Sequence, residues 1–270
     1  LLKICQKVYA NSPKPPTQFT AVPTVPNPPD HWQIRSDLSP TTVTLDDSYW
    51  QVWQNTTQTH QYAIAVRGPV NAGSSDFTDF LLPMIKARFS IPLPQNDSFE
   101  TLDFNLARDE VGSTIEAGVH AGFALSLMLM LGSTDCPLMF SLGRLAALNF
   151  ASNDRLQLFV SGHGQGASVA LLLTSFIRHS ALFSGIRTKT YAFGPAKPGN
   201  DHYANDLDQI AGAKGMCFSV CNSQDWVPQV PLTLQNLENV NTPNSFFGYP
   251  YASVADAPQA VVQMHDSVNR

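Results

Sequence analysis

The sequence has few charged residues. Asp, Glu, Lys and Arg make up 14% of its 270 positions, well below the roughly 25% of an average soluble protein. The formal net charge is -5, and no cluster of Lys and Arg offsets it locally. Because binding to a phosphate backbone depends on concentrated positive charge, we expect no nucleic-acid partner.

Cysteine is also scarce. The four residues Cys5, Cys136, Cys217 and Cys221 are too few and too scattered to staple a small secreted scaffold. The run around Cys217 and Cys221 is typical of a strand, in which residues four apart are separated by roughly 13 Å. We therefore expect these two thiols to form a buried, reduced pair on one face of a strand, and we expect no metal site.

Long hydrophobic runs are absent. The longest apolar stretch, residues 121–132, is shorter than the roughly 20 residues that a membrane-spanning helix needs. Because the sequence begins with Leu1 in place of Met, we expect that an upstream leader was trimmed. That leader is either a signal peptide or an expression leader, and the first would make the protein secreted.

The hydrophobic fraction of 43% is enough for a sizeable core, and we expect residues 1–270 to form one domain. Prolines crowd residues 13–29, so we expect residues 1–40 to form an extended N-terminal arm. Apolar spacing predicts helices over residues 45–55, 76–89 and 121–131 and a buried strand over residues 61–66.

The second half of the sequence alternates regularly between strand and helix patterns. Strands are predicted at residues 156–160, 188–193 and 216–220, and helices at residues 165–179 and 201–210. This alternation predicts an α/β fold with a mainly parallel central sheet and helices on both faces.

The glycine-rich segment between the first of these strands and its helix is the most informative motif. It reads Gly162-His163-Gly164-Gln165-Gly166. In serine hydrolases with this strand-turn-helix arrangement, the turn is Gly-x-Ser-x-Gly, and a strained backbone holds the serine hydroxyl above the sheet. The outer glycines are present here, but Gly164 occupies the serine position, so we expect a fold that is kept and a nucleophile that is missing.

Five segments in order resemble the class-three lipases, the fungal-lipase-like branch of the α/β-hydrolase fold. They are Val66-Arg67-Gly68, Val119-His120-Ala121-Gly122-Phe123, Val160 to Ala167, Tyr191 to Asn200, and Asn222-Ser223-Gln224-Asp225-Trp226-Val227-Pro228. The likeness extends from about Tyr62 to the C-terminus. It implies a lipase or carboxylesterase that acts on acyl esters of lipids, with possible contact to a lipid interface and without a cofactor.

The resemblance also implies a catalytic triad in the order nucleophile, acid, histidine. Gly164 holds the nucleophile position, Asp225 matches the acid and His265 lies where the family has its histidine. The implied oxyanion donors are the backbone N–H of Gln165 and one from Pro69 or Val70, of which Pro69 has no N–H.

Two histidines and one segment receive further expectations. We expect His163 and His120 to be structural histidines that pack beside the turn and the sheet. We expect residues 74–97 to contain a lid or pocket rim, because the apolar stripe of the predicted helix follows the oxyanion strand. The stripe consists of Phe77, Phe80, Leu81, Met84 and Ile85; an ordinary core-packed helix is the alternative.

Three functions remain open at this point. The first is a serine hydrolase present in a nucleophile-less form, either engineered or naturally lost. The second is a natural pseudoenzyme that binds lipid or a partner. The third is a dinucleotide-binding oxidoreductase, since Gly162-x-Gly164-x-x-Ala167 also fits that fingerprint; however, no Asp or Glu between Arg155 and Pro198 is available to hold the ribose.

Overall fold

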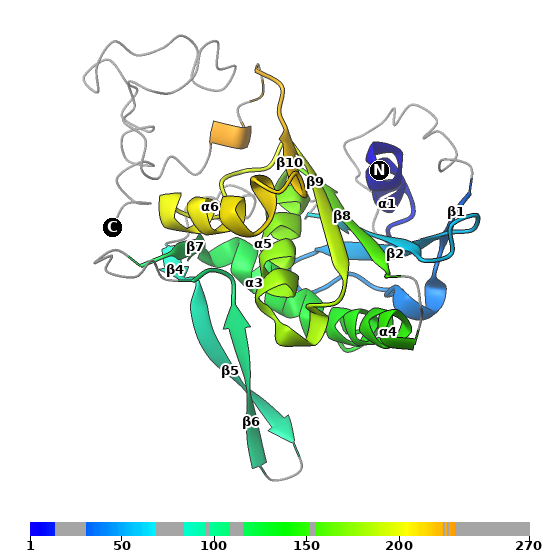
Figure 1. Ribbon diagram of the computed structural model, residues 1–270, viewed down its shortest axis with the longest axis horizontal. Helices are drawn as coiled ribbons and strands as arrows, with labels where there is room; N and C mark the ends of the chain where they lie inside the picture. The colour runs from blue at the N-terminus through cyan, green and yellow to red at the C-terminus, as the bar shows by residue number, and fades with distance from the viewer. Residues whose placement is uncertain are drawn as a thin grey trace.

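The computed structural model describes residues 1–13, 31–68, 84–95, 98–108, 116–151, 155–223, 225 and 227–229. At its centre lies a six-stranded sheet in the order β1-β2-β3-β8-β9-β10 (Figure 1). The strands are β1 (Trp32–Ile34), β2 (Tyr49–Asn55), β3 (Gln61–Arg67), β8 (Gln157–His163), β9 (Arg187–Phe193) and β10 (Cys217–Val220). β2 pairs antiparallel with both β1 and β3. The neighbours from β3 to β8, β9 and β10 pair parallel, which confirms the predicted mainly parallel sheet.

Helices cover both faces of this sheet. On one face α3 (Ala121–Leu131), α4 (Leu138–Ala151) and α5 (Gln165–His179) share the main hydrophobic cluster with strand residues such as Val52 and Ile64. On the other face α1 (Leu2–Ala10) packs Ile4 and Val8 against Trp53. Side chains of β2 and β3 alternate between the two clusters, as a strand buried on both sides requires. Among the described residues, no helix combines the length and the apolar character that crossing a bilayer requires.

The prediction of an extended arm over residues 1–40 is wrong where the structure describes that range. Residues 2–10 form α1, and β1 and the short helix η1 (Ser36–Leu38) follow later in the range. The buried Ile4, Cys5 and Val8 have helical spacing, so the signal for α1 was present in a short segment. The proline-rich residues 14–30 lie outside the described residues.

The helix predicted over residues 45–55 is a strand, β2. Tyr49, Val52 and Trp53 have helical spacing, but every residue from Tyr49 to Trp53 is buried. Because both faces are covered, the spacing of apolar residues carries no information about periodicity, and the aromatic and β-branched composition favours the strand.

The helix predicted over residues 76–89 is also wrong over its described part. Residues from Met84 onward form β4 (Met84–Lys86), which pairs with β7 (Gly118–His120), and β5 (Arg88–Gln95), which pairs with β6 (Ser98–Asn105). Pairing between distant segments has overridden the local helical pattern. The β5–β6 hairpin projects from the body of the molecule (Figure 1). Residues 76–83 lie outside the described residues.

The strand and helix alternation in the second half is confirmed. Each predicted strand and the first predicted helix correspond to β8, α5, β9 and β10. The helix predicted over residues 201–210 is α6 (Asp201–Leu207), which passes into a π-helical turn, η3 (Asp208–Gly212). The side chain of Asn200 accepts a hydrogen bond from Tyr203 N and so caps the start of α6.

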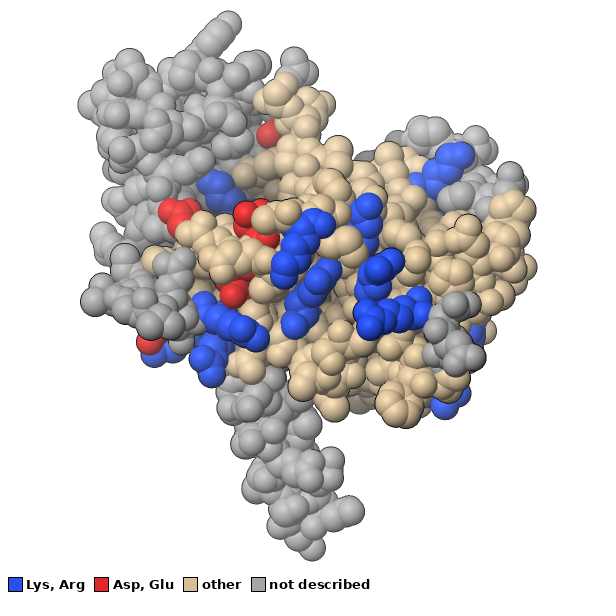
Figure 2. Space-filling view, viewed as in Figure 1, with Lys and Arg blue, Asp and Glu red and all other residues tan. Residues whose placement is uncertain are grey.

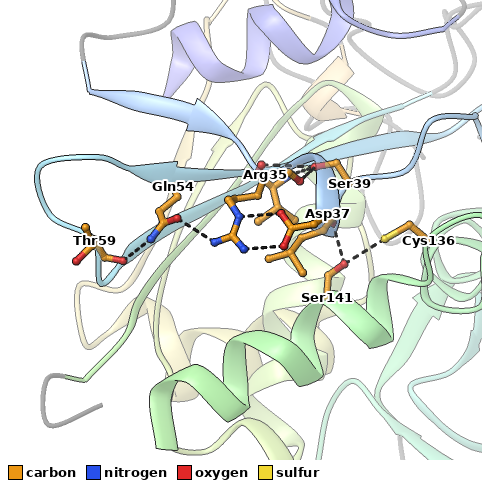
Figure 3. A network of polar contacts seen from close by, with 9 residues as sticks. Arg35, Asp37, Ser39, Gln54, Thr59, Cys136 and Ser141 are labelled. Atoms are coloured by element: carbon orange, nitrogen blue, oxygen red, sulfur yellow. Dashed lines mark hydrogen bonds and ion pairs between the residues drawn. The ribbon is translucent and has the colours of Figure 1, made fainter. Parts of the chain in front are cut away.

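A polar network ties the segment between β1 and β2 to α4 (Figure 3). The Arg35 guanidinium group forms an ion pair with Asp37 at 2.6 Å and donates a hydrogen bond to Gln54 at 2.9 Å. Ser141 of α4 donates a hydrogen bond to the Leu38 carbonyl at 2.8 Å. These contacts hold the side of the sheet formed by β1 and β2. The candidate site lies elsewhere, at the carboxyl ends of the parallel strands.

Candidate active site

The turn between β8 and α5 has the geometry that the glycine motif predicts. Gly164 has φ 58° and ψ -130°, a backbone conformation that residues with a Cβ adopt only under strain. Its N–H donates to the Phe193 carbonyl at the end of β9 at 2.9 Å. Its own carbonyl accepts a hydrogen bond from Ala167 N at 2.9 Å, in the first turn of α5. The turn is therefore held from the neighbouring strand and from the helix.

The outer glycines of the turn are required by packing. A Cβ on Gly162 would overlap the Gly166 carbonyl and lie 2.8 Å from Ala167 N. A Cβ on Gly166 would lie 2.6 Å from Val66 O and 2.7 Å from Gly68 N. No side chain fits at either position without displacing backbone, which is why β8, α5 and the end of β3 can approach so closely.

The central position differs, because a Cβ on Gly164 would meet no atom within 4 Å. Glycine there is favoured only by the positive φ, and a side chain would cost roughly 1–3 kcal/mol of backbone strain without a clash. The turn thus has room for a serine hydroxyl that the sequence does not supply.

Asp225 lies at the same carboxyl edge of the sheet, beyond the end of β10. Its backbone N–H donates to the Asn222 carbonyl, and its Oδ1 accepts a hydrogen bond from Val227 N, both at 3.0 Å. A Cβ on Gly194 would lie 2.9 Å from Asp225 Oδ2. Gly194 follows Phe193, whose carbonyl binds Gly164, so the end of β9 lies between the two candidate positions. Ligands of open α/β sheets bind at this edge.

The remaining sequence-predicted residues are only partly within the described structure. His265, Pro69, Val70, Phe77, Phe80 and Leu81 lie outside the described residues. Met84 and Ile85 lie in β4, where they pair with His120 and Val119 of β7. Gln165 is the first residue of α5 and is partly buried. The structure therefore brings Gly164, Gln165 and Asp225 to one edge and leaves the assembly of a triad with His265 as a prediction.

The start of α5 lies against the end of β3, where the implied oxyanion segment begins. A Cβ on Gly68 would lie 2.9 Å from Gly166 N and 3.0 Å from Gln165 Cβ. The first N–H groups of a helix carry a partial positive charge and are suited to a developing anion. Gln165, the first residue of α5, therefore follows residue 164 directly at this helix start, and its role as an oxyanion donor stays a prediction.

Arg67, the last residue of β3, makes buried polar contacts beside this region. Its side chain received no role in the sequence analysis. Its side chain is fully buried, donates a hydrogen bond to the Asp47 carbonyl at 2.9 Å and lies 3.7 Å from Asp47 Oδ2. The guanidinium group also lies 5.9 Å from the centre of the Tyr49 ring. Desolvation lowers the pKa of Arg67, and the nearby Asp47 carboxylate opposes that shift.

The N-terminal helix contributes Tyr9 to the same region. The Tyr9 hydroxyl donates a hydrogen bond to the His163 carbonyl at 3.2 Å and also forms one with the Gly68 backbone. Burial raises the pKa of Tyr9 to about 12. Tyr9 thereby joins the ends of β3 and β8 beside residue 164, and only recognition of α1 would have revealed this from the sequence.

His120 and His163 were both expected to be packed, structural histidines. His120 is packed as expected, but His163 is not. His120 is fully buried, its ring centre lies 4.3 Å from that of Phe123, and its backbone N–H donates to the Pro198 carbonyl. His163, in contrast, is exposed and meets the Tyr9 ring edge-on at 6.3 Å. Side chains of β8 alternate between the two faces of the sheet, and His163 lies on the face that α1 packs against. At this end of β8, α1 does not bury the His163 side chain.

The expected pair of buried thiols is also corrected. Cys217 is only partly buried and Cys221 is exposed, and both are free thiols. Cys217 lies in β10 but Cys221 follows the end of that strand, so the two do not share a strand face. Among the described residues, no group of His, Cys, Asp and Glu side chains could hold a metal ion.

Comparison with known proteins gives concordant results. The family model for lipase (class 3) matches residues 93–235. A secreted mono- and diacylglycerol lipase, LIP4 of Malassezia restricta, is 37% identical over 78 residues, which cover 29% of this chain and 24% of the relative. The chain therefore spans about a quarter of that curated relative.

Two solved structures share the fold. The crystal structure of M37 lipase has a TM-score of 0.55 at 17% identity and covers 87% of this chain and 66% of its own. Lip2 lipase from Yarrowia lipolytica also has a TM-score of 0.55 at 17% identity, covering 85% of this chain and 71% of its own. At these identities the likeness establishes the α/β-hydrolase fold.

Proposed function

This chain belongs to the class 3 lipase family, and from that premise we propose that its fold is that of an acyl-ester hydrolase whose present form lacks the nucleophile. The hydrolase fold would act on lipid esters through a serine at position 164, with His265 as base and Asp225 as the carboxylate that orients it. With Gly164 in that place, the usual covalent route is closed.

One observation supports the proposal: the turn at Gly164 has the positive φ of a nucleophile turn, a conformation that strains only residues with a Cβ, and it has open space where a side chain would stand. Glycine commonly replaces other residues where packing excludes a Cβ. Packing excludes a Cβ at Gly162 and Gly166 but not at Gly164. The central glycine is therefore not needed to build the turn, and a serine there fits the surrounding atoms.

The chemistry follows from the arrangement at the carboxyl edge. In a Gly164→Ser chain the new hydroxyl oxygen would attack the ester carbonyl carbon while its proton passes to His265, and the same proton would then leave with the alcohol. The acyl-enzyme would be hydrolysed by water in the reverse sense. The Gln165 N–H, at the start of α5, would stabilise the oxyanion, and the N–H of Val70 would be the second donor because Pro69 has none.

The substrate class and location extend the same proposal. The similar proteins are named as secreted mono- and diacylglycerol lipases. We infer lipid esters as the substrate class, with contact to a lipid interface, and export from the cell. The rim of the acyl pocket is assigned to residues 74–97, and the whole chain, residues 1–270, to one domain.

The test compares Gly164→Ser with Gly164→Ala on p-nitrophenyl butyrate. Both variants carry the same backbone strain, but only the first has a hydroxyl. We expect hydrolysis from the serine variant alone, because loss of a nucleophile typically costs about 10⁶ in rate. If only one oxyanion donor acts, the rate will be lower by roughly 10² to 10³, and adding Pro69→Thr will raise it.

A second candidate is a natural lipid-binding or partner-binding protein without catalysis. Two departures favour it: Gly164 removes the nucleophile, and Pro69 removes an oxyanion donor. A folded Gly164→Ser variant that hydrolyses nothing, with and without Pro69→Thr, would reject the hydrolase proposal and leave this candidate.

A further inference from the structure

Basic residues are concentrated in one part of the chain. Between Cys136 and Asn200 the sequence has six Lys and Arg residues and one acidic residue, Asp154, although the whole chain has a formal net charge of -5. Asp154 lies outside the described residues. Figure 2 shows Lys and Arg side chains grouped over β8, β9 and α4, whereas the Asp and Glu side chains of this view lie mostly toward α6. Such an asymmetry of charge indicates an anionic partner.

Exposed apolar side chains are concentrated in the same part of the fold. Among the described residues, ten large apolar side chains are exposed, and four of them lie on α4 and the adjoining η2 (Ala181–Phe183). Phe150, near the end of α4, is 95% exposed, and Leu182 of η2 is 70% exposed. Single exposed apolar residues are ordinary, but a group of them marks a contact surface.

Three contacts bring these segments together at the amino ends of β8 and β9. The Leu156 N–H, just before β8, donates to the Asn149 side chain of α4 at 2.7 Å. The Arg187 N–H, at the start of β9, donates to the Leu156 carbonyl at 3.0 Å. A Cβ on Gly185 would lie 2.8 Å from Asn149 Nδ2, so the segment after η2 packs on α4. The exposed residues of this region form the amino-edge surface, which consists of Arg144, Leu148, Phe150, Arg155, Leu182 and Arg187.

We propose that the amino-edge surface docks the chain onto a lipid bilayer that contains anionic lipids. The three arginines contact the negatively charged headgroups, while Phe150 and Leu182 enter the boundary between headgroups and acyl chains. Basic side chains beside exposed apolar ones are the combination that binds an anionic bilayer, because charge attracts the surface and apolar burial holds it.

Acidic side chains do not neutralise the arginines of this surface. Asp37 is near enough to Arg144 to feel its charge, but it is already paired with Arg35 at 2.6 Å. Within the described part of the chain, neither Arg155 nor Arg187 forms an ion pair. The positive charge of the surface is therefore available to an anionic partner.

The same features argue against other occupants. A second copy of the chain, placed surface to surface, would bring like charges together. A nucleic acid would gain from the arginines but would leave Phe150 and Leu182 in water. A bilayer satisfies both kinds of side chain, since it offers negative charge and an apolar layer a few ångströms beneath it.

The amino-edge surface lies at the opposite end of the parallel strands from the candidate active site. The length of β8, residues 157–163, separates it from Gly164 by roughly 20 Å. Docking here leaves the carboxyl edge directed away from the bilayer, so this contact differs from the pocket rim that we assign to residues 74–97. The inference is independent of the proposed hydrolysis.

Cosedimentation of the purified chain with lipid vesicles tests the inference. One set of vesicles contains phosphatidylcholine alone, and the other contains an equimolar mixture with phosphatidylserine. Each arginine near an anionic surface contributes about fivefold to binding, so we expect the mixed vesicles to bind at least about tenfold more strongly. In about 1 M salt, where the Debye length is only about 3 Å, this difference should disappear.

Charge variants locate the surface. Arg155→Gln and Arg187→Gln should each weaken binding to the mixed vesicles about fivefold and leave binding to phosphatidylcholine vesicles unchanged. Lys3→Gln, at an exposed position of α1, removes the same charge elsewhere and should have no effect.

Apolar variants test insertion. Phe150→Ser and Leu182→Ser should each weaken binding to the mixed vesicles by up to about tenfold, because their burial in the bilayer is lost. Leu45→Ser is the matched control, since Leu45 is also 95% exposed but precedes β2, and it should bind as the unaltered chain does.

Absent binding to the mixed vesicles, or equal binding to both sets, would overturn the inference without any variant. Binding that no change in the amino-edge surface weakens would place the lipid contact elsewhere and also reject it. Duplex DNA that binds as tightly as the mixed vesicles, with Phe150→Ser and Leu182→Ser silent toward both, would show a purely electrostatic surface and overturn lipid docking. These measurements need no hydrolysis, so an inert Gly164→Ser variant would leave their outcome unchanged.

Discussion

Gly194 leaves space for Asp225: a Cβ on Gly194 would lie 2.9 Å from Asp225 Oδ2. Gly194 also has φ 56° and donates its N–H to the Val220 carbonyl at 2.8 Å, so the last residue of β10 and the carboxylate beyond it are both placed by one glycine. The position of the candidate acid therefore depends on the end of the neighbouring strand.

Gly194→Ala should lower the free energy of unfolding by more than the strain of a positive φ alone. The matched control is Gly215→Ala, where φ is 64° and a Cβ meets no atom within 4 Å. We expect about 1 kcal/mol of destabilisation for the control and a larger loss for Gly194→Ala, measured by urea denaturation. Equal losses would show that Asp225 shifts without cost.

Gly162→Ala should destabilise the fold far more than Gly164→Ala. At position 162 the added methyl group overlaps the backbone of Gly166, which cannot move without separating β8 from α5, whereas at position 164 it enters open space. We expect a loss of roughly 1–3 kcal/mol at position 164 and loss of the folded state at position 162. Thermal unfolding followed by circular dichroism provides the comparison, and a similar midpoint for both variants would contradict it.

Tyr9→Phe removes the hydrogen bonds to the His163 carbonyl and to the Gly68 backbone. We expect a stability loss of roughly 0.5–1.5 kcal/mol for each hydrogen bond removed. In the Gly164→Ser background it should also lower kcat with little change in KM, because the turn becomes less well positioned. Tyr203→Phe makes the same chemical change at the Ser175 contact, away from the turn, and should affect stability alone.

Lys197 should make stability depend on pH in the alkaline range. Its pKa is lowered from an ordinary 10.5 to about 8 by burial. Between these values the unfolded chain binds a proton that the folded chain lacks, so the free energy of unfolding rises with pH. Relative to Lys197→Met, the unaltered chain should become more stable from about pH 8 to 10.5, measured by urea denaturation across that range. A constant difference would mean that the Lys197 ammonium group is well solvated.

The sequence was most informative where helices and strands alternate and each strand is a short apolar run. β8, α5 and β9 were predicted for this reason, and so was the turn at Gly164. It was least informative for β2, whose burial on both faces hides any period, and for β4, whose identity depends on pairing with β7. Such pairings join distant segments and leave no local signature.

The same contrast applies to the candidate site. Gly164, Gln165 and Asp225 were predicted as site residues because a motif surrounds each of them, and the structure brings all three to one edge; their roles stay predictions. Tyr9 was not found, because it reaches the turn from a helix more than 150 residues earlier in the chain, and a single tyrosine carries no motif.

The crowding at Gly162 and Gly166 means that the glycine motif can be conserved for folding alone, whether or not the chain is active. A side chain at either position would disrupt folding, so both glycines would be maintained by selection for a folded chain even in a lineage that no longer hydrolyses esters. Residue 164 is free of that constraint. Random substitution at this turn would therefore be tolerated better at position 164 than at either outer glycine, so the two glycines would persist whether or not residue 164 is a nucleophile.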